Sequence, residues 1–256
     1  MSGPAVDAVR FEDKDGARWI TLDRPPVNVL DLATVEALDA ALATLGERRD
    51  LKVVVLRSAI ARTFSAGVDV RDHARERVDA MLAAVHGVFR RLDALPQATI
   101  AAVDGTCLGG GCELAALCDI VLATARSVFG QPEIDVGCFP PLASVWLPRI
   151  APRAAAELIL TGAPIGAAEA ARVGLISRVV DDLETETRRL VRLLGGKSAA
   201  VLKVARRAVR DGAHGSFAEA LARVEGLYRE GLLATKDVDE GVQAFLEKRP
   251  PRWTDG

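Results

Sequence analysis

The chain has 256 residues, half of them hydrophobic and only 4% aromatic, so one compact domain with a large aliphatic core is expected. Its formal net charge of -2 leaves no basic excess for binding nucleic acid or an anionic membrane. No apolar run approaches the roughly 20 residues that span a bilayer. Residues 1–10 carry an acidic side chain and lack an apolar signal core, so we expect no export signal and a cytoplasmic location.

Strand-like and helix-like segments alternate along most of the chain. Asp31 is a candidate cap for the first predicted helix, and Pro96 ends the second. This alternation predicts an α/β fold built from strand–strand–helix units. The pattern predicts strands at residues 19–22, 52–56, 99–103 and 119–123, and helices at residues 35–45, 78–92 and 110–117.

The end of the chain has a different pattern. From about Gly195 onward we find helical periodicity and no convincing strand. We therefore expect an α/β core with the active site over residues 1–195 and a helical region over residues 196–256. The expected helices of this second region cover residues 202–209, 217–229 and 238–246.

The cysteines predict neither a disulfide framework nor a metal site. They show no CxxC spacing, and two of them fall in a segment that reads as a buried helix. We expect reduced, structural thiols at Cys107, Cys112, Cys118 and Cys138.

The first segment with possible chemistry is Phe-Ser-Ala-Gly-Val-Asp at residues 64–69. Its glycine, Gly67, permits a tight turn that leaves amide N–H groups exposed. An ordinary strand-to-helix turn with Asp69 as a helix cap explains the same residues. By itself this segment does not decide between a site and a turn.

The second segment, residues 105–113, contains Gly109, Gly110 and Gly111 and ends at Glu113. Glycines permit close approach of a ligand, and the free N–H groups of a helix start suit a developing oxyanion. Glu113 is either a carboxylate that complements the helix dipole or a functional group. Apolar residues follow it, and a buried carboxylate is costly without a purpose.

The third segment, residues 129–137, places Glu133 directly after a proline. Glu133 is either a turn residue or a second functional carboxylate. Together, the three segments could supply two N–H donors and two glutamates, which is what general acid–base chemistry on a carbonyl compound needs. Sequence spacing alone does not show that these groups converge.

Over nearly its full length the chain resembles the crotonase (enoyl-CoA hydratase/isomerase) superfamily. The resemblance implies a spiral of ββα units followed by a helical trimerisation region, in agreement with the pattern read above. It also implies an acyl-CoA substrate, with coenzyme A as part of the substrate and no separate cofactor or metal, and a homotrimer or dimer of trimers. The segments that carry it are residues 64–70, 103–123, 129–137, 160–180 and 245–249.

The same resemblance assigns roles to individual residues. The N–H groups of Ala66 and Gly110 would form the oxyanion hole for the thioester carbonyl. Glu113 and Glu133 fall on the two carboxylate positions of hydratases, with Glu113 toward the water and Glu133 toward the α carbon. Further residues expected to bind substrate are Ser65, Val68, Asp69, Gly109, Phe139, Leu142, Phe245 and Lys248.

Two departures from the family pattern concern the acyl group. Phe139 and two prolines replace a glycine-rich turn, which predicts a different floor for the acyl pocket. The Asp72-His73 pair and the ending at residues 243–250 look like the cyclohexa-1,5-diene-1-carbonyl-CoA hydratases. His73 is either a substrate contact or a surface helix residue. His86 and His214 are interpreted as structural.

Several functions stay open on this fold. The pair of glutamates favours an enoyl-CoA hydratase for a linear or cyclic substrate. An isomerase or an acyl-CoA hydrolase would use one glutamate. A non-catalytic scaffold or RNA-binding relative is a third class, against which the near-neutral charge and the glutamate pair both count.

Overall fold

The computed structural model describes residues 8–46 and 48–256. Residues 1–7, part of the stretch in which no export signal is expected, lie outside the described residues. The main sheet has six strands in the order β1-β2-β4-β7-β9-β12; β1 and β2 are antiparallel and the other pairs are parallel. These strands are β1 (Val9–Lys14), β2 (Ala17–Leu22), β4 (Val53–Ser58), β7 (Ala98–Val103), β9 (Ile120–Ala123) and β12 (Arg178–Val179).

A second sheet of four strands has the order β11-β10-β8-β5, and β3 pairs with β6 in a two-stranded sheet. The chain repeatedly leaves the main sheet, adds a strand to the second sheet and then enters a helix: β4, β5 and α2, then β7, β8 and α3. This is the predicted spiral of ββα units. The bounds are β3 (Val29–Leu30), β5 (Thr63–Ser65), β6 (Gly67–Val68), β8 (Thr106–Leu108), β10 (Val128–Gly130), β11 (Ile165–Gly166), α2 (Val78–Ala94) and α3 (Gly110–Ala116).

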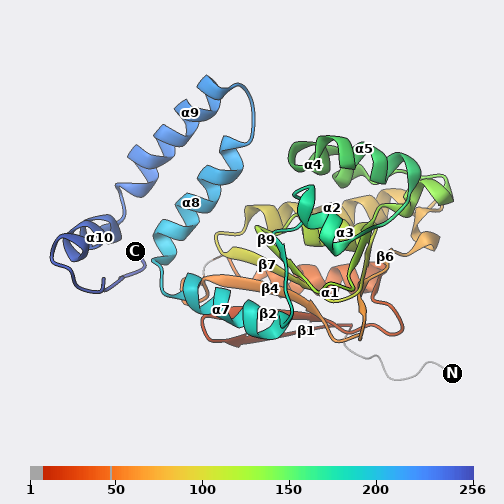
Figure 1. The fold of residues 1–256 in the computed structure, drawn as a ribbon, viewed down its shortest axis with the longest axis horizontal. Coiled ribbons are helices and arrows are strands. Elements are labelled where there is room, and N and C mark those ends of the chain that lie inside the picture. The colour runs from red at the N-terminus through yellow and green to blue at the C-terminus, as the bar shows by residue number, and fades with distance from the viewer. Residues whose placement is uncertain (1–7, 47) are drawn as a thin grey trace.

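The central strands of the main sheet are buried on both faces, because helices cover each face and successive strand residues point to opposite sides. Val54 and Leu56 of β4 belong to the core that is shared with α1 (Leu32–Ala43) and α2. Val53 and Val55 belong to the core on the other face, under α7 (Leu183–Gly195). Figure 1 shows α1 and α7 on opposite sides of the strands.

In the N-terminal half, one helix start and one helix end lie where the sequence signals predicted them. The Asp31 side chain accepts a hydrogen bond from the Thr34 amide at the start of α1, and α2 ends before Pro96. Several short elements were not predicted, because they lack a long apolar period. They are η1 (Val70–His73), η2 (Pro132–Val136), α4 (Pro141–Ile150), α5 (Pro152–Thr161) and α6 (Ala167–Arg172).

The C-terminal region is helical, as predicted, and projects away from the sheets (Figure 1). Asp119 fastens its first helix to the core, because the carboxylate accepts from Arg206 (2.7 Å) and Arg210 (2.8 Å) as well as from the Thr99 amide of β7 (2.8 Å). The division at residue 195 stays a prediction. The elements are α8 (Ala199–Gly212), α9 (Phe217–Gly226), the π-helical turn η3 (Leu227–Leu232) and α10 (Lys236–Leu246).

Two further predictions concern the membrane and the thiols. Within the described ranges, no helix combines the length and apolar character needed to cross a bilayer. All four cysteines are free thiols; Cys107, Cys112 and Cys118 are buried, and Cys138 is half-buried.

Candidate active site

The three glycine- and glutamate-bearing segments meet at one cavity of about 480 Å³. The turn before η1 contributes Val68, the start of α3 contributes Gly110 and Glu113, and η2 contributes Glu133. The side of α2 closes the cavity with Met81, Leu82 and Val85. The convergence that sequence spacing did not show is therefore present in the fold.

Glu113 is almost completely buried, with 5% of its surface exposed. Burial raises the pKa of its carboxyl to about 7, the nearby Glu133 charge adds to this rise, and the amides of Ala143 and Leu142 oppose it. The Ala143 amide donates to Glu113 Oε1 over 2.7 Å. Both amides lie at the N-terminus of α4, where unpaired N–H groups and the helix dipole favour a carboxylate.

The α4 contact was missed by the sequence interpretation, which treated the two prolines as a rigid turn. Pro141 is instead the first residue of α4. Proline is common at that position, because the amide it lacks would have no partner inside the helix. This signal could have identified the amides that hold Glu113.

Glu133 is held against Gly109 at the entry to α3. Gly109 has φ of 51° and ψ of -131°, a backbone conformation that favours glycine. A Cβ atom at this position would lie 2.6 Å from Glu133 Oε1. Burial raises the pKa of the Glu133 carboxyl, and charge on His73 lowers it. Gly109 thus gives Glu133 its place beside the α3 start.

The Ala66 amide does not fit the predicted oxyanion role, because it already donates to the Val27 carbonyl over 3.0 Å. Directly after β6, the Asp69 amide donates to the Leu30 carbonyl of β3. A Cβ atom on Gly110 would lie 3.5 Å from the Val68 nitrogen. The turn amide beside Gly110 is therefore that of Val68.

Gly110 lies where a second amide donor is expected, and its role as that donor stays a prediction. It is the first residue of α3, so its amide has no acceptor in a preceding helical turn. It lines the cavity together with Val68 and Glu113. Two backbone N–H groups and two carboxyl groups therefore surround the same space.

Two predicted substrate contacts support the turn instead of lining the cavity. The fully buried Ser65 hydroxyl donates to the Asn28 carbonyl (2.7 Å) and accepts from the Gly67 amide (3.1 Å). Asp69 caps η1 by accepting from the Arg71 amide (2.9 Å) and pairs with the Arg71 side chain. The alternative interpretation of Asp69 as a helix cap is correct.

The residues predicted to contact the acyl group, Phe139 and Leu142, are placed only partly as expected. Phe139, Pro140 and Pro141 line the cavity, and Phe139 is 64% exposed in the single chain. The Leu142 side chain packs against the core and faces an adjoining cavity, so Leu142 meets the site through its amide. His73 and His86 both line the active-site cavity, and a structural role for His86 stays a prediction.

Phe245 and Lys248 are not brought to the cavity within one chain. Phe245 lies on α10 and is 82% exposed. Figure 1 shows α10 at the far end of the C-terminal region from α3. Any contact of these two residues with substrate requires another copy of the chain.

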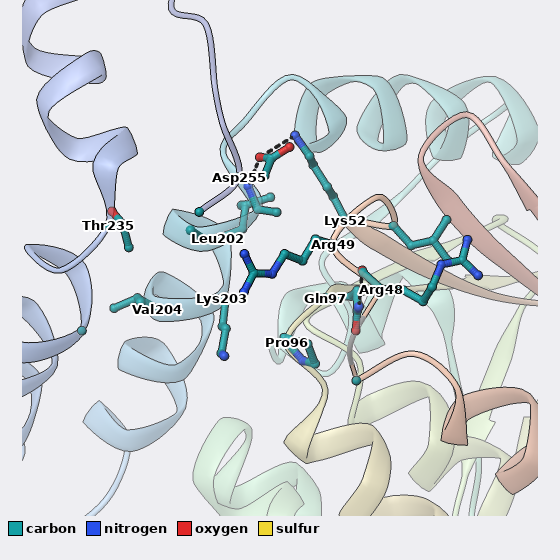
Figure 2. Close-up of a pocket in the computed structure, with 16 residues that line it drawn as sticks. Arg48, Arg49, Lys52, Pro96, Gln97, Leu202, Lys203, Val204, Thr235 and Asp255 are labelled. Atoms are coloured by element: carbon teal, nitrogen blue, oxygen red, sulfur yellow. Dashed lines mark hydrogen bonds and ion pairs between the residues drawn. The ribbon is translucent and has the colours of Figure 1, made fainter.

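A larger cavity of about 600 Å³ lies between α8 and the loop that follows α1. It is lined by the cations of Arg48, Arg49 and Lys203 and by the Lys52–Asp255 ion pair of 3.0 Å (Figure 2). Neither Glu113 nor Glu133 lines this larger cavity, and the turns at Gly67 and Gly109 do not reach it. Chemistry therefore favours the smaller cavity as the active site. Nowhere in the described ranges do three metal-ligating side chains cluster.

The family model for enoyl-CoA hydratase/isomerase matches residues 12–256, which include both sheets, the cavity and the C-terminal helices. The chain belongs to the enoyl-CoA hydratase/isomerase family. This is the crotonase superfamily, whose members act on acyl-CoA thioesters, and the predicted fold is confirmed. The fold of this family member matches that of an enoyl-CoA hydratase from Bacillus anthracis with a TM-score of 0.91, at 31% identity, over 97% of this chain and 100% of the other.

Curated relatives of this enoyl-CoA hydratase/isomerase family member cover nearly the whole chain. A probable enoyl-CoA hydratase from Mycobacterium bovis is 39% identical over 241 residues, 92% of this chain and 93% of the relative. A cyclohexa-1,5-dienecarbonyl-CoA hydratase from Thauera aromatica is 37% identical over 248 residues, 94% of each chain. Because the two identities are so similar, they do not identify the acyl group of the substrate.

Proposed function

We propose that this protein is an enoyl-CoA hydratase that adds water across the activated C=C bond of an acyl-CoA thioester. The observation that supports the proposal is the pair of Glu113 and Glu133 on one cavity beside the Val68 and Gly110 amides. Water addition needs a base for the water and an acid for the α carbon. An isomerase or a hydrolase would need only one of the two carboxyl groups.

The proposed reaction begins with a water molecule held by the Glu113 carboxylate. Glu113 takes one proton from the water, and the oxygen bonds to the β carbon. The C=C electrons move toward the thioester, whose oxygen gains charge beside the Val68 and Gly110 N–H groups. Protonated Glu133 then delivers a proton to the α carbon, which restores the thioester. Glu113, with a pKa of about 7, can hold and release a proton near neutral pH.

For the acyl group we propose a cyclic dienoyl thioester or a short enoyl thioester. Phe139, Pro140 and Pro141 form a stiff, bulky wall, and an aromatic ring packs well against a flat substrate. The similarity to the Thauera aromatica hydratase agrees with this choice.

A substrate screen tests both parts of the proposal. Linear and cyclic enoyl-CoA thioesters are incubated with the protein, and product masses are measured. A mass gain of one water is expected, with a higher kcat/KM for cyclic or short substrates than for long chains, and with Phe139→Ala narrowing that preference. A shifted double bond without mass gain would identify an isomerase, and free coenzyme A a hydrolase. No reaction with any thioester would favour a scaffold or RNA-binding role.

We further propose that the chain assembles as a trimer or a dimer of trimers, with the α/β core and the C-terminal helices as separate structural regions. Exposed apolar side chains such as Phe217 on α9 support this, because isolated helices would leave them in water. In such an assembly Lys248 and Phe245 of a neighbouring copy could meet the coenzyme A moiety. Light scattering at micromolar concentration measures the mass, and a stable monomer would contradict the assembly.

A further inference from the structure

The proposed hydration leaves the two carboxyl groups in the wrong protonation states for the next turnover. Glu113 has gained a proton from water and Glu133 has given one to the α carbon. Glu113 must therefore lose a proton to solvent, and Glu133 must gain one. The Oε2 atom of Glu133 is buried and has no hydrogen-bond partner among the described residues. Oε1 lies against Gly109. Proton exchange at Oε2 therefore has to pass through the cavity that Glu133 lines.

His73 lines the same cavity as this carboxyl group. It is the last residue of η1, is half-buried, and lines the active-site cavity. Its Nδ1 atom is 3.1 Å from the Asp69 carbonyl oxygen. A carbonyl oxygen only accepts, so Nδ1 carries the proton and Nε2 of the neutral ring keeps its lone pair. The backbone thereby fixes a ring with one nitrogen left to exchange protons.

The charges around His73 select Glu133 as its partner. On η1 and its cap, Asp69 is paired with Arg71, and Asp72 is paired with Arg77 over 3.0 Å. Asp135 of η2 and His86 of α2 line the same cavity. Asp135 is exposed, unlike the Oε2 atom of Glu133. Glu133 lines the same cavity as His73, and a positive charge on His73 would lower the Glu133 pKa that burial raises. Glu133 is therefore the carboxyl group near His73 that needs a proton carrier.

We propose that His73 returns a proton from solvent to Glu133 after each turnover; this role rests on the proposed hydratase function. Nε2 takes a proton from solvent water to form the imidazolium. The Nε2–H proton then passes to Glu133 Oε2, directly or through one water molecule, and the neutral ring is restored. Glu113 releases its proton to solvent in the same cycle, so the enzyme returns to its starting state with no net proton change. His73 acts through Glu133 and does not touch the reacting carbons.

The test is His73→Asn compared with His86→Asn. Asparagine places an amide N–H where Nδ1 was, so the contact with Asp69 is kept while the proton-carrying Nε2 is lost. We expect kcat of His73→Asn to fall by about 10²-fold, the lower end of proton-transfer effects. Because recovery follows the chemical step, kcat/KM should stay near the wild-type value. Added imidazole should restore kcat in proportion to its concentration. His86, whose pKa is lowered by burial, is the matched cavity histidine.

Three outcomes separate the possibilities. An imidazole-dependent kcat in His73→Asn, absent from wild type and from His86→Asn, supports the proton-return role. An unchanged kcat, or an equal loss of kcat and kcat/KM with no response to imidazole, would overturn it. If wild type itself adds no water to any thioester, the proposed function fails first. Should His73→Asn unfold, His73→Gln with the same imidazole titration gives the answer.

Discussion

The helix that carries Glu113 and the helices of the C-terminal region differ in how much of their surface one chain covers. Every residue of α3 is buried. By contrast, α8 has no buried residue and α9 has only Ala220. The proposed carboxyl pair is thus placed by the packing of a single subunit. The C-terminal helices leave apolar side chains in water, with Phe217 83% exposed, and need another surface to cover them.

The strongest way to test this difference is to remove a proton-transfer group from the core. We expect Glu113→Gln and Glu133→Gln each to lower turnover by about 10²–10⁴-fold while coenzyme A binding and assembly stay intact. Steady-state kinetics, a binding titration and light scattering check the three parts. Glu157→Gln, a change at an exposed glutamate of α5, is the matched control. Near wild-type turnover in either site variant would remove that residue from the mechanism.

Glu113→Gln should also change how stability depends on pH. The carboxyl pKa rises from 4.5 to about 7 on folding, mainly through burial. The stability that goes with protonated Glu113 is complete below about pH 4.5 and is lost as the pH rises through about 7. Such a rise corresponds to about 3 kcal/mol. Relative to wild type, Glu113→Gln should therefore gain about that much unfolding free energy between pH 4.5 and pH 8. Urea unfolding at both pH values measures it, and a pH-independent difference would contradict the buried carboxyl.

A pair of glycine substitutions separates placement of Glu133 from general stability. Gly109→Ala puts a Cβ atom 2.6 Å from Glu133 Oε1 at a positive φ, and displacing a catalytic group by about 1 Å can cost about 10²-fold in turnover. Gly87→Ala in α2 meets nothing within 4 Å, so it should keep turnover and add about 0.5–1 kcal/mol of stability. Equal turnover of the two variants would mean that the Gly109 contact does not position Glu133.

The smallest effect belongs to the C-terminal helices. Phe217→Ser should weaken association by about 1.5–3 kcal/mol, because a large apolar side chain would no longer be buried between copies. Leu160→Ser, at a 71% exposed position of α5 in the core, is the control and should leave the mass unchanged. Sedimentation or light scattering over a dilution series measures both. An unchanged mass for Phe217→Ser would place the contact between copies elsewhere.

The parts of the fold with long apolar periods could be predicted from the sequence. α1 and α2 carry regular apolar stripes with Asp31 and Pro96 as boundary signals, and both formed as expected. β1 was missed, because five of its six residues are exposed and mostly polar, so no apolar pattern marks it. α4 was missed, because its two leading prolines also suit a turn, and only the helix that follows shows that Pro141 is a start.

For the site, residue identity was easier to predict than hydrogen bonding. Glu113 and Glu133 were found from apolar neighbours and motif resemblance, and they do share one cavity. The assignment of Ala66 as an oxyanion donor was wrong, because its amide donates to the Val27 carbonyl. Val27 lies in a separate turn, and no local sequence pattern links the two residues. Ser65 was misassigned for the same reason, since its partner Asn28 lies 37 positions away.

The four cysteines differ in burial, so the reactivity of one of them can report whether the cavity is occupied. Burial keeps the pKa of Cys107 high and raises that of Cys118 to about 12, so these thiols stay protonated and shielded from reagents. Cys112 is also fully buried, whereas Cys138 is half-buried and lines the cavity beside Phe139. A maleimide should therefore label Cys138 first. A thioester in the cavity should slow that labelling, which would report occupancy by mass spectrometry without any turnover.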